Sequence, residues 1–211
     1  MTQNATSDSV VVVIDDDGAV RAALKELLES VGLKVILFQS AADFLESTVP
    51  DTTCCMVLDV RMPAMSGLKL QEELARAEVQ VPIVFITGHG NIAMAVRAMK
   101  AGAIDFLTKP FSDQDLLDAV FAALERDRAR RSLEELTSTL RERFNSLSAR
   151  EKEVLAGVAA GRLNKQIAAE LGVSEVMVKV HRANGMRKMH AKSVAEMVRM
   201  TDLLRAGQAP T

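Results

Sequence analysis

The stretch CCMVLDVRMP, residues 54–63, decides the fold of this chain. Five apolar residues run without a break into Asp59, and Pro63 prevents the strand from continuing far beyond it. Uninterrupted apolar runs, in contrast to alternating ones, are typical of parallel strands covered on both faces. The stretch therefore predicts a buried strand that carries a carboxylate at its C-terminal end, where open α/β sheets bind their ligands.

Further apolar runs of this kind alternate with amphipathic stretches up to residue 125. We expect strands at residues 10–14, 34–38, 54–58, 82–86 and 103–107. We expect helices at about residues 18–30, 41–47, 67–77, 91–101 and 113–125. Five strand–helix units predict an α/β fold, a flavodoxin-like, doubly wound five-stranded parallel sheet.

Four of the expected strands deliver polar side chains to one edge of this sheet. Asp15 and Asp16 follow the first strand, Asp59 the third, Thr87 the fourth and Lys109 the fifth. Neighbouring carboxylates raise one another's pKa, so a hard divalent cation, Mg²⁺ or Mn²⁺, is expected among them. In this interpretation Asp59 attacks a phosphoryl group, and Lys109 neutralises the charge on its oxygens.

Charge is divided unevenly along the 211 residues, although the net charge is only −2. Residues 1–125 carry 9 Lys and Arg against 18 Asp and Glu, whereas residues 141–211 carry 13 against 7. These opposite balances indicate an acidic domain joined to one suited to nucleic acid. No secretory signal and no bilayer-spanning apolar stretch is recognisable, which predicts a cytoplasmic protein without a membrane partner. Cys54 and Cys55 are expected to be apolar strand residues.

A long helix is expected between the two halves, because no Gly or Pro interrupts the pattern from residue 113 to Phe144. Leu133, Leu136, Leu140 and Phe144 recur at helical spacing and would suit a short coiled-coil seam between two copies of the chain. The strongly charged run 126–131 fits a solvated linker helix equally well. Both interpretations stay open.

The C-terminal part is expected to be all helix. Ser148 and Glu151 form a capping-box pattern, and Asn164 is expected to cap a short helix. The turn at Gly172 and Ser174 is followed by a second helix, so the two helices and the turn between them are predicted to form a helix-turn-helix. The second helix is expected to turn Val176, Val180 and Met186 toward the core and a basic face outward, as a helix in the major groove does.

Residues 10–125 resemble the receiver domain of two-component response regulators, in the motifs VVVIDDD, VLDVRMPAMSG, VFITGHG and DFLTKPF. The resemblance implies that Asp59 accepts phosphate from a phosphohistidine of a sensor histidine kinase, with Thr87 and Lys109 holding the phosphoryl group. It also implies a Mg²⁺ ion, whose ligands would be Asp16, Asp59 and the backbone carbonyl of Arg61, with Asp15 acting through water.

The same resemblance implies a conformational switch. Phe106 is the aromatic residue that would rotate inward when Thr87 moves, and the Lys109–Pro110 bond would be cis. His89 is expected to be an exposed loop residue, with a role in phosphate lifetime as the alternative. The phosphorylated receivers would pair through a face that contains Val96, Arg97, Met99 and Lys100, although Val96 or Met99 could instead be core.

Residues 148–200 resemble the LuxR-type DNA-binding domain, in the motifs LSAREKEVLAGVAAG, NKQIAAELGVS and VKVHRANGMRKM. By position, the residues that would touch bases or the nearby backbone are Lys179, Val180, Ala183 and Asn184. Those expected to contact phosphates are Asn164, Lys165, Arg182, Arg187 and Lys188. Met177 and Gly185 depart from the family pattern; Gly185 would either loosen the helix or admit a close neighbour.

Together these features predict a transcription regulator controlled by phosphorylation. Its parts would be a receiver at 8–125, a helical linker at 126–144 and a LuxR-type helix-turn-helix domain with four helices at 145–207. The expected partners are a sensor histidine kinase, promoter DNA, a second copy of the chain on activation and RNA polymerase, and the expected effect is activation. No enzymatic activity is expected beyond the receiver's own phosphotransfer and dephosphorylation.

Two alternatives follow from the same residues. A haloacid-dehalogenase-like phosphatase also uses an aspartyl nucleophile, but its nucleophile follows the first strand and a second Asp lies two residues on, where this chain has Arg61. The helical domain could also bind protein or RNA in place of DNA.

Overall fold

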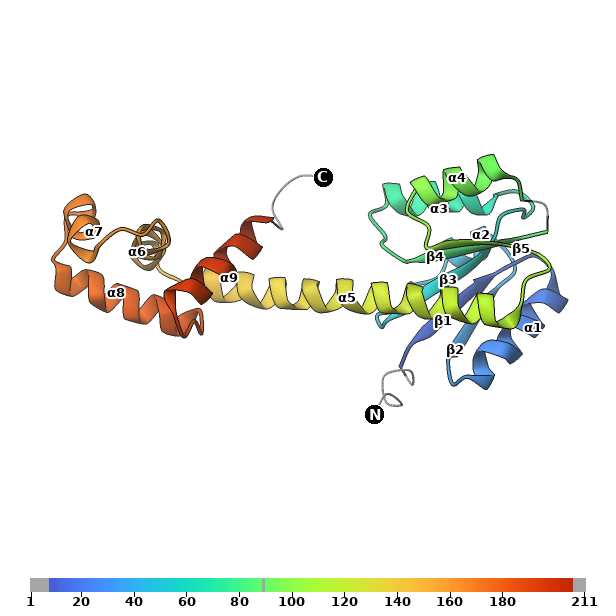
Figure 1. Cartoon of the computed structure of the whole chain (residues 1–211), viewed down its shortest axis with the longest axis horizontal. Helices are drawn as coiled ribbons and strands as arrows, with labels where there is room; N and C mark the ends of the chain where they lie inside the picture. Colours follow the sequence, from blue (N-terminus) through green and yellow to red (C-terminus); the bar gives the residue numbers. More distant parts are fainter. Residues whose placement is uncertain (1–7, 89, 207–211) are drawn as a thin grey trace. The chain divides into compact units, whose positions relative to one another are not determined.

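Five parallel strands form the sheet of the N-terminal unit (Figure 1). They are β1 (Val10–Ile14), β2 (Lys34–Phe38), β3 (Cys54–Asp59), β4 (Ile83–Thr87) and β5 (Asp105–Thr108), in the order β2-β1-β3-β4-β5. This order confirms the predicted flavodoxin-like fold. The structure, a computed structural model, describes residues 8–88 and 90–206.

β4 and β5 begin later than expected, for two physical reasons. Pro82 has no N–H to give to the ladder, so β4 starts one residue later. Ala103 still donates its N–H to the carbonyl of Ala98, which keeps it in the turn that closes the preceding helix. The C-terminal ends of β1, β3, β4 and β5, which carry the polar residues, lie within one residue of their predicted positions.

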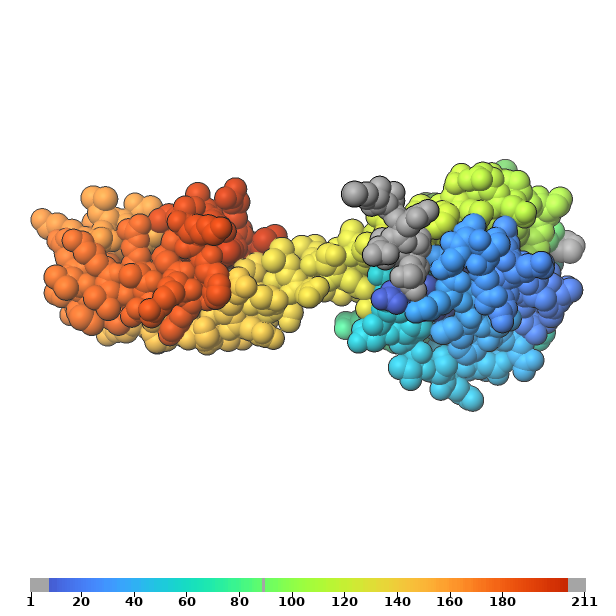
Figure 2. All heavy atoms as spheres, turned by 90° about the horizontal axis from the view of Figure 1, so that it is seen from below, coloured from blue at the N-terminus to red at the C-terminus, as the bar shows by residue number. Residues whose placement is uncertain are grey.

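Helices cover both faces of the sheet (Figure 1). They are α1 (Gly18–Ser30), α2 (Ala41–Leu45), α3 (Gly67–Arg76), α4 (Ile92–Lys100) and α5 (Asp113–Asn145). Helix α1 and the first turns of α5 pack on one face, and α2, α3 and α4 on the other. Figure 2 views the unit from the side of α1, where α1 (blue) and the start of α5 (yellow-green) form neighbouring parts of the surface. Cys54 and Cys55 are buried free thiols in this core, as predicted, and burial raises the pKa of both.

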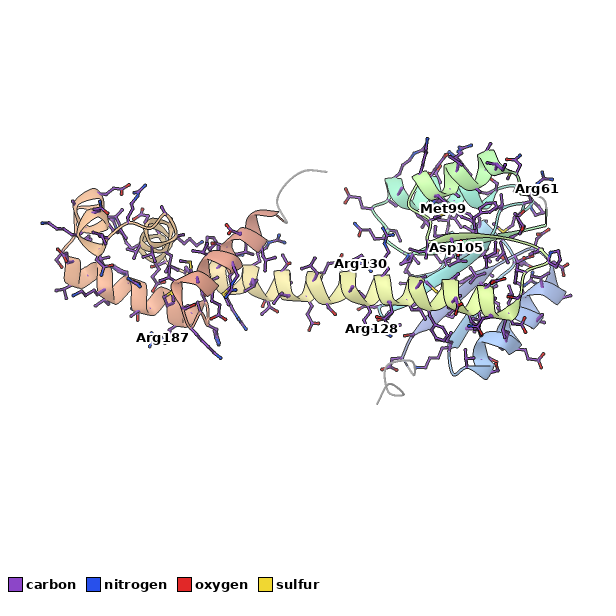
Figure 3. All side chains as sticks on the ribbon, viewed as in Figure 1. Arg61, Met99, Asp105, Arg128, Arg130 and Arg187 are labelled. Atoms are coloured by element: carbon purple, nitrogen blue, oxygen red, sulfur yellow. The ribbon has the colours of Figure 1, made fainter. Side chains whose placement is uncertain are left out.

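Asp127 fixes α5 against the start of β3. Its carboxylate is fully buried and accepts the Cys54 N–H at 2.9 Å. Arg130 donates to the same carboxylate at 2.6 Å and Arg131 at 2.9 Å, and Arg131 also reaches the Pro50 carbonyl at 3.2 Å. Figure 3 shows Arg128 and Arg130 at the end of the sheet opposite Arg61. The chain divides into two compact units between Arg131 and Ser132, so this anchor belongs wholly to the first unit.

We predict that Asp127→Ala lowers the free energy of unfolding of the N-terminal unit by about 2 kcal/mol. The substitution leaves the buried Cys54 N–H without its acceptor and two guanidinium groups without their shared carboxylate. Urea titration of the full chain measures the effect. Asp118→Ala, which changes an exposed acid on the same helix, is the control and is expected to stay within about 0.5 kcal/mol of the wild type. Equal effects of the two substitutions would contradict the anchoring role.

The C-terminal unit consists of the end of α5, which the sequence analysis assigned to the linker, and the four further helices that were predicted. These are α6 (Ala149–Ala159), α7 (Asn164–Leu171), α8 (Glu175–Lys188) and α9 (Val194–Ala206). The expected capping box of Ser148 and Glu151 starts α6. Asn164 is not the cap of α7: Leu163 occupies that position, and its N–H is satisfied by the Gln166 side chain at 2.8 Å. Residue 207, the last of the predicted domain, lies outside the described residues.

The structure divides the proposed coiled-coil stripe between two environments. Leu140 is buried in the core of the C-terminal unit, and Phe144 packs against that core. Leu133 and Leu136 are exposed. A seam built from all four residues is therefore wrong, because half of its apolar surface is already used within one chain. Among the described residues, no helix combines the length and the apolar character needed to cross a bilayer.

Candidate functional site

The carboxyl edge of the sheet brings two acids and an amine together. Asp15 directly follows β1, and Asp59 is the last residue of the neighbouring strand β3. Lys109 Nζ lies 2.7 Å from Asp15 Oδ2 and 3.6 Å from Asp59 Oδ1. Both acids are almost buried, and Asp59 is only 6% exposed. The three side chains therefore form one charged group at the β1–β3 switch point, where sheets of this topology bind ligands.

Opposing effects act on the pKa of the Asp59 carboxyl group. Burial raises the pKa of the Asp59 carboxyl above its ordinary value, and the Lys109 ammonium acts against this effect. The neighbouring Asp15 carboxylate raises the pKa further, whereas the Arg61 N–H, which donates to Asp59 Oδ2 at 3.0 Å, lowers it. One oxygen of Asp59 is thus held by the main chain, and the other faces the ammonium.

The three consecutive acids after β1 have three different environments. Asp15 points inward and accepts the Asp17 N–H at 2.8 Å. Asp16 is exposed, and Asp17 caps α1 by accepting the N–H groups of Ala19 and Val20. Within residues 8–88 and 90–206, no group of three or more His, Cys, Asp or Glu side chains is already arranged to hold a metal ion, so the expected cluster of Asp15, Asp16 and Asp59 is not assembled in this structure. Lys109 lies beside both Asp15 and Asp59 and offsets part of their negative charge.

The two residues of the expected switch lie on the neighbouring strands β4 and β5. Thr87 is completely buried at the end of β4, and its carbonyl accepts the Lys109 N–H at 2.7 Å. Phe106 is half-buried beside Phe85, with 6.2 Å between the ring centroids. The Lys109–Pro110 bond is cis, as the resemblance implies. His89, the predicted loop residue, lies outside the described residues.

Two glycines at this edge were not singled out from the sequence. A Cβ on Gly90 would lie 2.8 Å from both Thr87 Cγ2 and Phe106 Cε1, so this glycine lies directly against the pair. A Cβ on Gly67 would lie 2.3 Å from the Asp59 carbonyl oxygen, and the Gly67 N–H donates to the Val60 carbonyl at 3.0 Å. A glycine in a loop is an ambiguous signal in one sequence, because loop conformation also favours it.

We predict that Gly90→Ala disturbs Thr87 and Phe106 and costs about 1–2 kcal/mol in the free energy of unfolding. The added methyl group would approach both side chains far inside normal contact distance. NMR shifts of residues 87 and 106, with denaturant titration, measure the effect. Gly88→Ala is a matched control, because no atom lies within 4 Å of a Cβ placed there. Indistinguishable spectra for wild type and Gly90→Ala would show that the close contact does not constrain the pair.

Helix α4 presents an apolar and basic surface. Val96 is 46% and Met99 45% exposed, so neither is a core residue, and Arg97 and Lys100 are exposed beside them. Figure 3 labels Met99 on this helix. Ile92, which the sequence analysis did not select, is the most exposed large apolar residue of the face at 85%. Arg97 donates to Glu72 of α3, and this hydrogen bond lowers the pKa of the Glu72 carboxyl.

The exposed face of α8 differs from the predicted one. Val178, Gly185 and Met189 face the core. Val176 and Val180 were expected there but are 68% and 45% exposed, because they lie on the opposite side of the helix turn from Val178. The exposed side chains of the helix include Val176, Lys179, Val180, Ala183 and Arg187, and Figure 3 labels Arg187. Apolar and basic groups are therefore presented together on one accessible surface.

The expected phosphate-contacting residues fall into two groups. Lys165 and Arg187 are exposed, and Arg187 donates to Asn184 Oδ1 at 3.1 Å. Arg182 is half-buried and approaches Asn164 Oδ1 at 3.5 Å. Lys188 already has partners within the chain: it donates to Glu151 Oε2 at 2.7 Å and to the Ser146 carbonyl at 3.2 Å, so its charge helps to hold α8 to the start of α6.

This internal ion pair has a pH signature. The hydrogen bond from Lys188, followed by the one from the Ser148 N–H, lowers the pKa of the Glu151 carboxyl. An acid with a lowered pKa in the folded state stabilises the fold above its ordinary pKa, and the contribution is lost as the pH falls through the lowered value. Protonation of Glu151 at acidic pH is therefore expected to weaken the packing of α8 on α6.

Gly185 allows a close neighbour, which is one of the two roles that the sequence predicted for it; the other was a loosened helix. A Cβ at this position would lie 2.9 Å from Leu155 Cδ1 of α6. The side chain of Leu155 therefore lies directly against the backbone of α8, in the space that an apolar side chain would fill.

Sequence comparisons agree with both halves of this geometry. The model of the response regulator receiver domain matches residues 11–121, and that of the bacterial regulatory proteins of the luxR family matches residues 145–201. This chain is a two-component response regulator with a LuxR-type DNA-binding domain. The haloacid-dehalogenase alternative does not fit, because Asp59 ends the third strand and not the first.

Several response regulators are similar over nearly the whole chain. Nodulation protein W of Bradyrhizobium diazoefficiens is 53% identical over 200 residues, which are 95% of this chain and 88% of that protein. Response regulator protein TodT of Pseudomonas putida is 50% identical over 93% of this chain and 87% of its own length. The solved structure of response regulator StyR is 49% identical, covers 92% of this chain and 98% of its own, and has a TM-score of 0.85.

Proposed function

We propose that this response regulator accepts a phosphoryl group on Asp59 from a sensor histidine kinase and then binds promoter DNA as a dimer to activate transcription. The observation that carries the proposal is the contact of Lys109 with both Asp15 and Asp59, on a chain that also exposes Lys179 and Arg187 on α8. These features support a phosphoryl acceptor and a DNA-binding surface on one polypeptide.

The phosphotransfer step needs little covalent chemistry from the protein. An oxygen of Asp59 attacks the phosphorus of a phosphohistidine, the new O–P bond forms, and the N–P bond to the imidazole breaks. The departing histidine keeps the bonding electron pair and takes up a proton. Lys109 Nζ is 3.6 Å from Asp59 Oδ1, a position from which the ammonium neutralises charge on the transferred group. Thr87, at the end of β4, would hold one phosphoryl oxygen through its hydroxyl.

The donor set around Asp59 fits a magnesium or manganese ion. All the candidate ligands are oxygens, the type that hard divalent cations prefer: Asp59, Asp16, the Arg61 carbonyl, and Asp15 through water. Asp15 and Asp59 are nearly buried with a single ammonium between them, so two negative charges are only half compensated. When bound, the ion supplies positive charge beside the phosphoryl oxygens.

The switch would run from the phosphoryl group to α4. Movement of Thr87 toward the new phosphoryl group vacates space beside it, and Phe106, half-buried on the next strand, turns inward. The face of α4 with Val96, Arg97, Met99 and Lys100 then pairs with the same face of a second copy. Phosphate shifts this equilibrium only by its preference for the active state. A dimer places two α8 helices on a two-fold operator and so raises the affinity for DNA.

DNA recognition is assigned to the exposed face of α8. Lys179, Val180, Ala183 and Asn184 would contact bases or the adjoining backbone, with Asn164, Lys165, Arg182 and Arg187 on phosphates. Lys188, which is paired with Glu151, stays a weaker candidate. Contact with RNA polymerase and a cytoplasmic location remain predictions of the same scheme.

We predict that Asp59→Asn abolishes dimerisation driven by a small-molecule phosphodonor and leaves the fold intact. The amide keeps the shape of the side chain but lacks the nucleophilic carboxylate. Sedimentation of the full chain with acetyl phosphate and Mg²⁺ measures dimers, and circular dichroism checks the fold. Asp118→Asn, an exposed acid on α5, is the control and should dimerise like the wild type. Dimers of Asp59→Asn that still depend on the phosphodonor would rule out this mechanism.

We predict that Lys179→Ala weakens operator binding. If Lys179 contacts a phosphate, the dependence of log K on log salt becomes shallower by about 1 at every site; a base contact would instead cost about 1–3 kcal/mol at one position. Binding to fragments selected from genomic DNA, titrated at several salt concentrations, distinguishes these cases. Lys25→Ala on α1 changes the same charge in the other unit and serves as the control. Wild-type affinity of Lys179→Ala at every salt concentration would remove Lys179 from the interface.

A further inference from the structure

A cavity of about 320 Å³ lies inside the C-terminal unit, between the end of α5, helix α6 and helix α9. We call it the α5–α6–α9 pocket. Its walls include Phe144, Leu155, Ala156 and Leu204, and Arg141 and Lys152 also line it. The volume falls near the lower end of the roughly 300–1,000 Å³ that is typical of small-molecule sites.

The walls of the pocket are built for an apolar body. Leu155 and Leu204 are buried residues of the unit's core, and Phe144 packs against that core. The ring of Phe144 lies beneath the Lys152 ammonium, which is 5.0 Å from its centroid. An apolar group placed in the pocket would therefore contact side chains that are already held in position.

All the charged side chains that line the pocket are positive. Arg141 and Lys152 contribute two cations, and no Asp or Glu belongs to the lining. Three other cations of the same unit have acidic partners: Arg150 pairs with Glu153, Arg162 with Glu170 and Lys188 with Glu151. For Arg141 and Lys152, no ion pair is found within residues 8–88 and 90–206. Two unneutralised cations beside an apolar cavity complement an amphipathic anion.

The pocket also adjoins the recognition helix. Leu155 forms part of its wall and at the same time lies against Gly185 of α8, where an added Cβ would be only 2.9 Å from Leu155 Cδ1. No side chain separates the two. A ligand that moves Leu155 would therefore move the backbone of α8 or be resisted by it, because closely packed interiors transmit such displacements.

We infer that the α5–α6–α9 pocket binds a small organic carboxylate with an apolar body, and that occupancy changes the affinity of α8 for DNA. The carboxylate meets Arg141 and Lys152, and the apolar body lies against Phe144, Leu155 and Leu204. The effect on DNA rests on the proposed function, whereas the binding site does not. Ligand and DNA influence each other by the same factor, as linkage requires.

The test uses the isotope-labelled full chain, with sodium octanoate as the probe and octanol as its uncharged counterpart. Amide NMR shifts during a titration should saturate at residues of the pocket, with a dissociation constant on the order of 1 mM for octanoate. Lys152→Gln and Arg141→Gln should each weaken octanoate binding about 5-fold and leave octanol binding unchanged. Arg150→Gln, which removes a cation outside the pocket, is the matched control. Ala156→Leu fills the cavity from an exposed position and should abolish binding.

Saturable shifts at the pocket, with octanoate binding weakened by Lys152→Gln and Arg141→Gln, unchanged by Arg150→Gln and abolished by Ala156→Leu, support the site. Absence of saturable shifts, shifts away from the pocket, or octanoate binding that survives Ala156→Leu would overturn it. In the second arm, operator affinity is measured with and without saturating octanoate, and a change that Ala156→Leu removes supports the coupling. An unchanged operator affinity at full occupancy would overturn the coupling. If the chain bound no DNA under any condition, the proposed function would fail, and the NMR arm would still decide the site.

Discussion

The contact of one ammonium group with two nearly buried carboxylates is the constraint on which the receiver depends. Asp15, Asp59 and Lys109 come from three separate strand ends, and in the β2-β1-β3-β4-β5 sheet both carboxylates lie within 4 Å of the Lys109 nitrogen. Two carboxylates and one ammonium leave an excess of negative charge in a poorly hydrated place. Such an arrangement is suited to recruit further positive charge and to change when a phosphoryl group arrives.

A buried carboxylate also organises the opposite end of the sheet, where its purpose is structural. Asp127 ties the start of β3 to α5 through the Cys54 N–H and two arginines. The acceptor strand β3 is thus held at its first residue by α5 and presents its last residue to the chemistry. In the C-terminal unit, the Lys188–Glu151 pair and the Leu155–Gly185 contact fix α8 on α6. Helix α8 is therefore held on α6 by both an ion pair and a close apolar contact.

Much of this could be predicted from the sequence, because the fold-determining signals are local. Apolar runs of five residues located every strand to within two residues, and the acids at the end of β1 and β3 marked the site.

The predictions that failed depend on which side of a helix or strand a residue faces. Val176 and Val180 were placed in the core because helical spacing alone does not determine which side of the helix is buried. In the structure, Val178 is the buried residue of this turn. The sequence also did not distinguish the three acids after β1, of which Asp15 is buried, Asp16 is exposed and Asp17 caps α1. Asp127 was missed because its role arises from Cys54, far along the chain, and Gly90 because its close approach to Thr87 and Phe106 depends on the folded arrangement of β4 and β5.

The central claim is that the carboxyl group of Asp59 carries the phosphoryl group. The most direct measurement is to incubate the full chain with acetyl phosphate and Mg²⁺, reduce the acyl phosphate with borohydride, and locate the modified residue by peptide mass spectrometry. The account predicts that Asp59 is converted to homoserine and that Asp15, Asp16 and Asp17 stay unmodified. Modification at one of these neighbours, or at a residue outside the carboxyl edge of the sheet, would contradict it.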